Sequence, residues 1–278
     1  MTLREQLRRL VDETGDGPVF VHSDLLTASL LVEEPLHPGE ILPYHISLLK
    51  EAASGRPLWM PAFNYDFPKT GRFDVRRSPS QVGALSEYFR TAVAQWRTED
   101  PVFSASGIGP RPDPPELGST TEAFGPCSIF GELDRRRATL LLYGTSIASA
   151  TISHYCEKQA GGPPYRYDKV FHGAVTRADG SCRSMEYVYH VRPMNRTLEY
   201  DCARLAQELR AAGLLREIQV NGRTAAQAIG AHALSLFWTE RLRADAFFLL
   251  HASTRAWVEP TFHALGRRFL LTDFEPPK

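Results

Sequence analysis

Short apolar runs alternate with stretches of helical spacing along the first half of the chain. The runs predict strands over 18–22, 58–63 and 138–143. The last of these is continuous, which is typical of a strand buried on both faces of a sheet. Helical spacing predicts helices over 2–14, 37–55 and 79–96, the last capped at Ser78 with Pro79 in its first turn. This alternation predicts an α/β/α sandwich around a central mixed sheet.

The second half of the chain has a different pattern. Residues 169–177 and 183–192 alternate on either side of Ala178-Asp179-Gly180 and predict an antiparallel β-hairpin. Helices are predicted over 198–212 and 224–243, and loops over 64–77 and 107–118. We therefore expect one domain over residues 1–278, with an α/β core in 1–165 and a hairpin plus helical portion in 166–278.

Composition narrows the class of protein. The 278 residues are 43% hydrophobic, enough for one large core. The 32 basic and 32 acidic residues cancel, which argues against a nucleic-acid partner, since such a surface needs a concentrated basic field. Residues 1–10 form a charged amphipathic pattern rather than a signal peptide, and no apolar run approaches 18 residues. We expect a cytoplasmic protein without a membrane partner.

The cysteines indicate neither a disulfide framework nor a zinc site. They are widely spaced and contain no C-x-x-C pair. We expect reduced, mostly buried thiols at Cys127, Cys156, Cys182 and Cys202.

Candidate chemistry follows the strand over 138–143. Thr151, His154 and Glu157 place a hydroxyl, an imidazole and a carboxylate at i, i+3 and i+6. On a helix, a carboxylate one turn away can orient an imidazole, and such a pair makes a general base. A helix that follows a buried strand also tends to face the crevice at the strand's carboxyl end. The alternative is a satisfied, partly buried His154 beside a solvated Glu157.

Other chemistry fits this region less well. His154-x-x-Glu157 lacks the second histidine of the helical zinc motifs, and no other histidine shows ligand spacing, so no metal site is expected. Cys156 points about 100° away from its helical neighbours, which favours core packing over a Cys-His dyad. Gln227–His232 approaches a pyrophosphate-loop pattern, but it lies inside a predicted helix, and we interpret it as a coincidence.

Six short motifs occur in order between about residues 18 and 160. They are His22-Ser23-Asp24-Leu25, Met60–Phe63, Ser78–Arg90, Pro101–Ser104, Gly125–Ser128 and the T-x-x-H-x-x-E segment at Thr151. In order and spacing, this set resembles the aminoglycoside 3-N-acetyltransferase family.

The resemblance implies a coenzyme A-dependent N-acyltransferase. Such an enzyme moves an acetyl or other short acyl group from acyl-CoA directly to an amine of an aminoglycoside or amino-sugar-like acceptor. By resemblance, His154 is the general base and Glu157 orients it, while Thr151 donates its hydroxyl to the developing oxyanion or the leaving thiolate. The donor site implied by the resemblance comprises Ser23, Asp24, Leu25 and Ser104.

Two departures from the family pattern leave alternatives open. Asp24 replaces a serine and Asp100 replaces a histidine. A carboxylate beside a phosphate is unfavourable, so Asp24 either points away or marks a changed donor site. Equally, Ser23 and Asp24 cap the next helical turn, and Ser104 has the same ambiguity. The alternative function is a catalytically silent protein that binds CoA or another ligand in the same fold.

The acceptor is predicted only as a small-molecule amine. Acidic or aromatic contacts to a cationic sugar are available at Tyr65, Asp66, Asp74 and Glu122, although each is also an ordinary loop residue. The zero net charge favours a singly aminated acceptor over a polycation. The sequence sets neither the acyl chain of the donor nor the oligomeric state.

Overall fold

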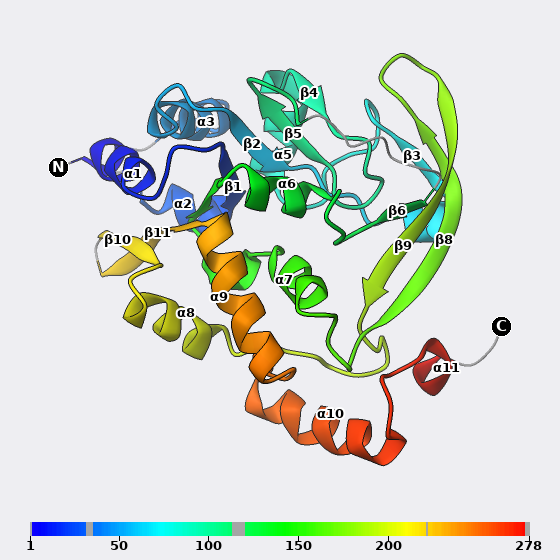
Figure 1. Cartoon of the computed structure of the whole chain (residues 1–278). Coiled ribbons are helices and arrows are strands. Elements are labelled where there is room, and N and C mark those ends of the chain that lie inside the picture. Colours follow the sequence, from blue (N-terminus) through cyan, green and yellow to red (C-terminus); the bar gives the residue numbers. More distant parts are fainter. Residues whose placement is uncertain (1, 32–35, 113–119, 221, 276–278) are drawn as a thin grey trace.

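The central sheet has seven strands in the order β10-β11-β7-β1-β2-β5-β4, as Figure 1 shows. The computed structural model describes residues 2–31, 36–112, 120–220 and 222–275. Three central strands run parallel: β1 (Val19–Ser23), β2 (Leu58–Pro61) and β7 (Thr139–Tyr143). All five residues of β7 are buried, as its unbroken apolar run predicts.

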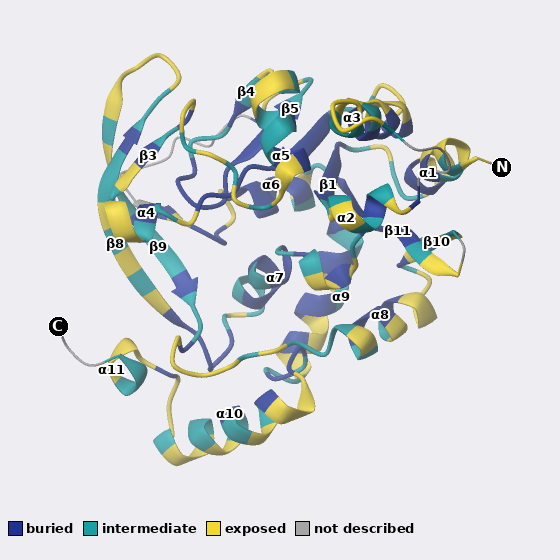
Figure 2. Cartoon of the chain, turned by 180° about the vertical axis from the view of Figure 1, so that it is seen from behind, coloured by how far each residue is buried: buried dark blue, intermediate teal, exposed yellow. Residues whose placement is uncertain are grey.

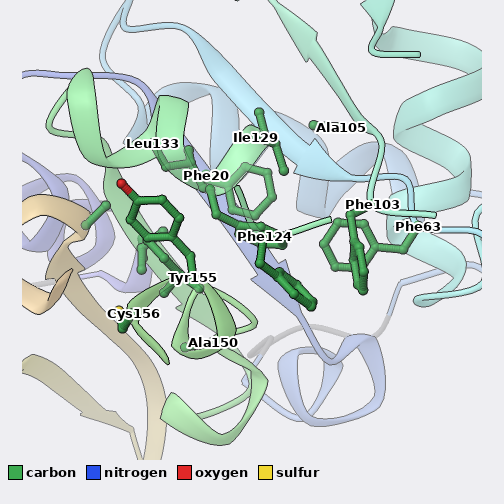
Figure 3. Close-up of a cluster of buried hydrophobic side chains, with 14 of the residues drawn as sticks. Phe20, Phe63, Phe103, Ala105, Phe124, Ile129, Leu133, Ala150, Tyr155 and Cys156 are labelled. Atoms are coloured by element: carbon green, nitrogen blue, oxygen red, sulfur yellow. The ribbon is translucent and has the colours of Figure 1, made fainter. Parts of the chain in front are cut away.

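Side chains of the central strands alternate between two apolar cores, one on each face of the sheet. Val19 and Val21 pack in the core that includes α1 (Leu3–Asp12) and α3 (Ile41–Ala52). Phe20 packs in the other core, with α6 (Ile129–Arg135), α7 (Ser153–Gln159) and α9 (Ala231–Ala244). Figure 3 shows part of this second core around Phe20 and Phe124. The predicted α/β/α sandwich is confirmed.

A second, four-stranded sheet has the order β3-β8-β9-β6. Its centre is the predicted hairpin, formed by β8 (Tyr167–Thr176) and β9 (Cys182–Val191), the long light-green ribbons in Figure 1. Parallel strands β3 (Arg72–Asp74) and β6 (Thr120–Glu122) flank it. The segment 64–77, predicted as a loop, thus contains β3 and also α4 (Phe67–Thr70). The protein is a mixed α/β fold with two mixed sheets.

The predicted loop over 107–118 is only partly described. Its start belongs to β5 (Ala105–Ile108), which pairs with β2 and β4. Residues 113–118 lie outside the described residues.

The helix predicted over 79–96 is shorter than its apolar spacing indicates. It consists of α5 (Ala84–Tyr88) and a π-helical turn over Phe89–Val93, and β4 (Trp96–Arg97) follows. Ser78 and Pro79 do not start it. Gly83, the residue before α5, has φ 111°, a left-handed conformation that ends any earlier helix.

The prediction of a helix over 224–243 is wrong for residues 224–230. Residues Arg223–Gly230 form β11, which pairs with β7 and with β10 (Arg216–Val220), and α9 begins only at Ala231. Alanine and glutamine favour a helix locally, but strand pairing covers the edge of β7, whose backbone groups would otherwise be unpaired.

The remaining helices lie after residue 200, as predicted, with shifted boundaries. The helix predicted over 198–212 is α8 (Cys202–Ala211), and Asp201 caps it through the Arg204 N–H. Two more follow, α10 (Ala252–Leu265) and α11 (Leu271–Phe274). No helix in the described parts of the chain has the length and apolarity needed to cross a membrane.

The four cysteines are free thiols, but the prediction that most are buried is wrong. Only Cys156 is buried, whereas Cys127 and Cys182 are exposed and Cys202 is half-buried. Cys182 starts β9 next to the hairpin turn, where the strand has left the core.

Arg97 fastens β4 to the segment that follows β2. The side chain is buried, and its guanidinium donates to the carbonyl oxygens of Ala62, Val75 and Ser78 and to the hydroxyl of Ser104. These bonds hold both ends of the 62–78 segment, which includes α4 and β3. Figure 2 shows buried and exposed residues mixed in this part of the chain, and Phe67, Phe73 and Val75 are among the buried ones.

We expect Arg97→Met to destabilise the fold strongly, because it leaves several buried carbonyls without donors. The free energy of unfolding should fall by at least about 3 kcal/mol, measured by urea denaturation. The control is Arg8→Met on the exposed surface of α1, which should change it by less than about 0.5 kcal/mol. Equal effects of the two substitutions would contradict the role of Arg97.

Candidate active site

The candidate catalytic segment lies at the carboxyl edge of the parallel strands. β7 ends at Tyr143, a 3-10 turn covers Ile147–Ser149, and α7 begins at Ser153. Because β7 is parallel to β1, the carboxyl ends of both strands meet at one edge of the sheet, where open α/β folds bind ligands. The first two turns of α7 carry His154 and Glu157.

The predicted contact between imidazole and carboxylate is present. His154 Nδ1 lies 3.0 Å from Glu157 Oε2. The Glu157 side chain is fully buried, whereas 24% of the His154 side chain is exposed. Glu157 is therefore not the solvated helix charge of the alternative interpretation, and His154 remains reachable from outside.

Four groups surround the Glu157 carboxylate. Its Oε1 accepts hydrogen bonds from the hydroxyls of Tyr165 at 2.8 Å and Tyr200 at 2.6 Å. Its Oε2 lies 2.9 Å from Arg166 Nε and also faces His154. Burial alone would raise the pKa of Glu157, but the Arg166 charge and the bonds from His154 and Tyr200 outweigh it and lower the pKa to about 2. The carboxylate therefore stays ionised.

This carboxylate sets the protonation of the His154 ring. An ionised carboxylate only accepts, so Nδ1 carries the hydrogen and Nε2 keeps its lone pair. Burial and the Arg166 charge lower the pKa of His154 below 6.5, although Glu157 opposes them. The ring also meets Phe124 edge to face, with centroids 5.0 Å apart. At neutral pH, His154 thus presents an oriented, uncharged imidazole.

Sequence reasoning missed three members of this cluster. Tyr165 and Arg166 belong to a Gly- and Pro-rich stretch, residues 161–167, to which we assigned no role from the sequence. A tyrosine and an arginine shortly after the helix that carries Glu157 could have suggested partners for its carboxylate. Tyr200 lies 43 residues from Glu157 along the chain, and no local pattern points to it.

A cleft of about 490 Å³ adjoins His154. One wall is the hairpin, which contributes Lys169 and Phe171 from β8 and Tyr189 and Val191 from β9. These residues alternate along their strands and therefore share one face of the second sheet. The volume lies within the range of small-molecule sites.

Thr151 and Cys156 lie on either side of His154 in the sequence, and the Thr151 carbonyl accepts the His154 backbone N–H at 3.2 Å. Thr151 precedes α7, and its hydroxyl is 3.4 Å from the Ser149 carbonyl oxygen. Its catalytic role stays a prediction. Cys156 is fully buried in the apolar core, which confirms the packing interpretation, and burial raises the pKa of its thiol well above the usual value.

The predicted donor motif spans the junction of β1 and α2 (Leu25–Ser29). Ser23 is the last residue of β1, beside Tyr143 of β7, and so lies at the same sheet edge as α7. Asp24 caps α2, since its carboxylate accepts the Thr27 N–H at 3.1 Å. Asp24 therefore performs the capping role that the sequence offered as an alternative. Donor contacts of Ser23, Asp24 and Leu25 stay a prediction.

Ser104, the fourth predicted donor residue, is fully buried. Its hydroxyl donates to the Ala62 carbonyl at 2.7 Å and accepts from Arg97 Nε at 3.0 Å. These bonds give Ser104 a clear structural role, and its donor contact remains untested.

Asp100, the second departure from the family pattern, is also buried. Its carboxylate accepts the N–H groups of Val102 and Phe103 and the hydroxyl of Tyr187 on β9. Burial raises the pKa of Asp100 to about 6, although these three bonds oppose the shift. The residue thus joins the turn before β5 to the hairpin.

Of the four predicted acceptor contacts, only Tyr65 is among the described residues that line the cleft. Asp66 accepts a hydrogen bond from the Gln81 side chain, and Asp74 accepts two backbone N–H groups of its own loop. Glu122 is exposed on β6.

The segment Gln227–His232 does not lie inside a helix, so our reason for dismissing it is wrong. It crosses from β11 into α9. Because β11 is antiparallel to β7, α9 begins at the sheet edge opposite His154. Within the described ranges, no group of three or more His, Cys, Asp or Glu side chains is placed to hold a metal ion.

Comparisons with known proteins identify the family and the fold. Residues 41–243 match the family model for aminoglycoside 3-N-acetyltransferase. A search of curated protein sequences gives no match.

Solved structures of aminoglycoside acetyltransferases share the fold. The apoenzyme of AAC(3)-IVa has a TM-score of 0.64 and 22% identity, over 96% of this chain and 97% of that one. AAC-IIIb, solved as a binary complex with CoASH, has a TM-score of 0.65 and 19% identity over 88% and 97%. AAC-VIa, solved with bound sisomicin, has a TM-score of 0.63 and 20% identity over 87% and 97%.

The family model covers well over half of the chain. This chain belongs to the aminoglycoside 3-N-acetyltransferase family.

Proposed function

We propose that this protein is a CoA-dependent N-acyltransferase that moves an acetyl or other short acyl group from acyl-CoA directly to an amine. One observation carries the proposal. His154 lines a cleft, and a buried, ionised Glu157 occupies its Nδ1 and leaves Nε2 as the basic nitrogen. A protein that only binds a ligand has no need of such a base.

The thioester supplies an activated carbonyl, and the chain's task is to manage the proton of the attacking amine. As the amide bond forms and the carbon–sulfur bond breaks, Nε2 of His154 takes one proton from the amine nitrogen. That proton is then available to the departing thiolate, so the products are an amide and free CoA thiol. Glu157 stabilises the imidazolium without accepting the proton, because its own pKa is held near 2.

Direct transfer needs no covalent enzyme intermediate. Cys156, the nearest thiol in sequence, is buried in the core with a raised pKa and is a poor nucleophile. Thr151 lies one turn before His154 and is the candidate to stabilise the developing oxyanion or the thiolate.

The donor is proposed to bind at the edge formed by β1 and α2. Ser23, Asp24 and Leu25 lie there, and Leu26 and Leu30 are 83% and 65% exposed nearby. Exposed leucines beside a polar strand end suit a ligand with both apolar and polar parts, such as an acyl-CoA. AAC-IIIb, which shares the fold, was solved with CoASH.

We expect His154→Ala to reduce thiol release from acetyl-CoA at least about a thousandfold with a competent amine, because the base is lost. CoA affinity, measured by calorimetry, should change less than about twofold. The control is His232→Ala, which removes a histidine paired with Asp134 outside the cleft, and it should keep full activity. Equal turnover in His154→Ala and the native protein would remove His154 from the mechanism.

The rate should depend on pH through His154. The base acts only when neutral, so kcat should fall as the pH drops through the pKa of His154, which lies below 6.5. Because the Glu157 charge raises that pKa, Glu157→Gln should move this inflection to lower pH and lower the plateau rate at least about tenfold. Inflections due to the amine itself stay where they are.

Asp134→Asn is the matched control: Asp134 lies on α6, pairs with His232 and accepts the Tyr155 hydroxyl, and it is not among the described residues that line the cleft. It should leave the pH profile unchanged. If Glu157→Gln lowers the rate but does not shift the inflection, Glu157 has a structural role only.

A further inference from the structure

We propose that the acceptor of this protein carries a phosphate or carboxylate in addition to its amine and is not a polycationic aminoglycoside. The inference deepens the proposed function and rests on it, because it assigns the cleft beside His154 to the acceptor. The charges of the described residues that line this cleft carry the inference.

Basic side chains dominate the cleft. Lys69, Arg166, Lys169 and Arg192 line it, and Glu275 is the one acid among the described lining residues. Arg166 is committed to Glu157, and Lys169 is paired with Glu275. Lys69 and Arg192 form no ion pair with any acid of the described residues, and Arg192 Nη1 donates only to the Arg196 carbonyl, so no acid neutralises these two charges at the cleft lining.

The basic residues surround an apolar floor. The Lys169 ammonium lies 5.8 Å from the centre of the Phe171 ring, and Tyr189 lies opposite Lys169 in the strand register. Lys69 approaches from α4, which the Ala174–Gly71 backbone bond ties to β8. A ligand that contacts the floor therefore places its polar groups among cations.

Acids that would suit a polycation lie elsewhere. Asp66 and Asp74 accept hydrogen bonds within their own loop, and Glu122 lies outside the described lining of the cleft. The Glu157 charge is buried and shared among Arg166, two tyrosines and His154. An acceptor with several ammonium groups would thus meet like charges, which disfavours binding.

The phosphates of CoA are the other anions that such a site could meet. None of the proposed donor residues, Ser23, Asp24, Leu25 and Ser104, lines this cleft. In a direct transfer, donor and acceptor must approach each other from different directions. The cleft is accordingly assigned to the acceptor, and a donor role becomes an outcome of the test.

The test compares glucosamine 6-phosphate, glucosamine and kanamycin as probes of the whole chain. We expect calorimetry to show glucosamine 6-phosphate binding at least about tenfold more tightly than glucosamine, and kanamycin binding more weakly than either. Lys69→Glu should weaken glucosamine 6-phosphate about threefold to tenfold, and adding Arg192→Glu should erase its advantage. Lys50→Glu, the same charge change at an exposed position of α3, should leave the affinity for glucosamine 6-phosphate unchanged.

The outcomes separate this inference from the proposed function. Equal binding of the two sugars, tighter binding of kanamycin, or no binding of the phosphorylated amine would overturn the inference. CoA affinity that falls in the double variant as much as glucosamine 6-phosphate affinity does would assign the cleft to the donor and also overturn it. Thiol release, recorded in the same samples, tests the transferase. Binding without turnover of any amine would overturn the transferase and leave the cleft as a binding site for an anionic amine.

Discussion

A buried carboxylate, Glu157, is the constraint on which the site depends. An ionised group without solvent costs several kcal/mol unless other groups compensate it. The compensation here comes from three parts of the chain: His154 on α7, Tyr165 and Arg166 just after it, and Tyr200 before α8. The same bonds that compensate the buried charge also fix the His154 imidazole. The ring is therefore oriented once the segments that carry Tyr165, Arg166 and Tyr200 have packed on α7.

The second sheet forms one wall of the cleft beside His154. The hairpin belongs to the second half of the chain, but its two flanking strands, β3 and β6, come from the first half. Tyr187 adds a buried hydrogen bond to Asp100. An aspartate in place of the usual histidine therefore has a clear use in this fold, because it accepts three donors that would otherwise be buried without a partner.

The sequence predicted the parts that local patterns encode. Continuous apolar runs gave the parallel strands, and the i, i+3 spacing placed His154 against Glu157. Prediction failed where distant pairing overrode local preference, as at Arg223–Gly230, which has helical composition but extends the sheet along β7. Tyr200 could not be found, because its importance arises only when a segment 43 residues away folds back onto α7.

Reactivity and recognition reside on different elements of this molecule. His154 and Glu157 belong to α7, whereas Lys169, Phe171, Tyr189 and Val191 of the cleft surface occupy alternate positions of two strands. Replacing Lys169, Phe171 or Tyr189 leaves every partner of the Glu157 carboxylate in place. Substitutions can therefore change what the cleft binds, residue by residue, while the contacts around Glu157 stay the same.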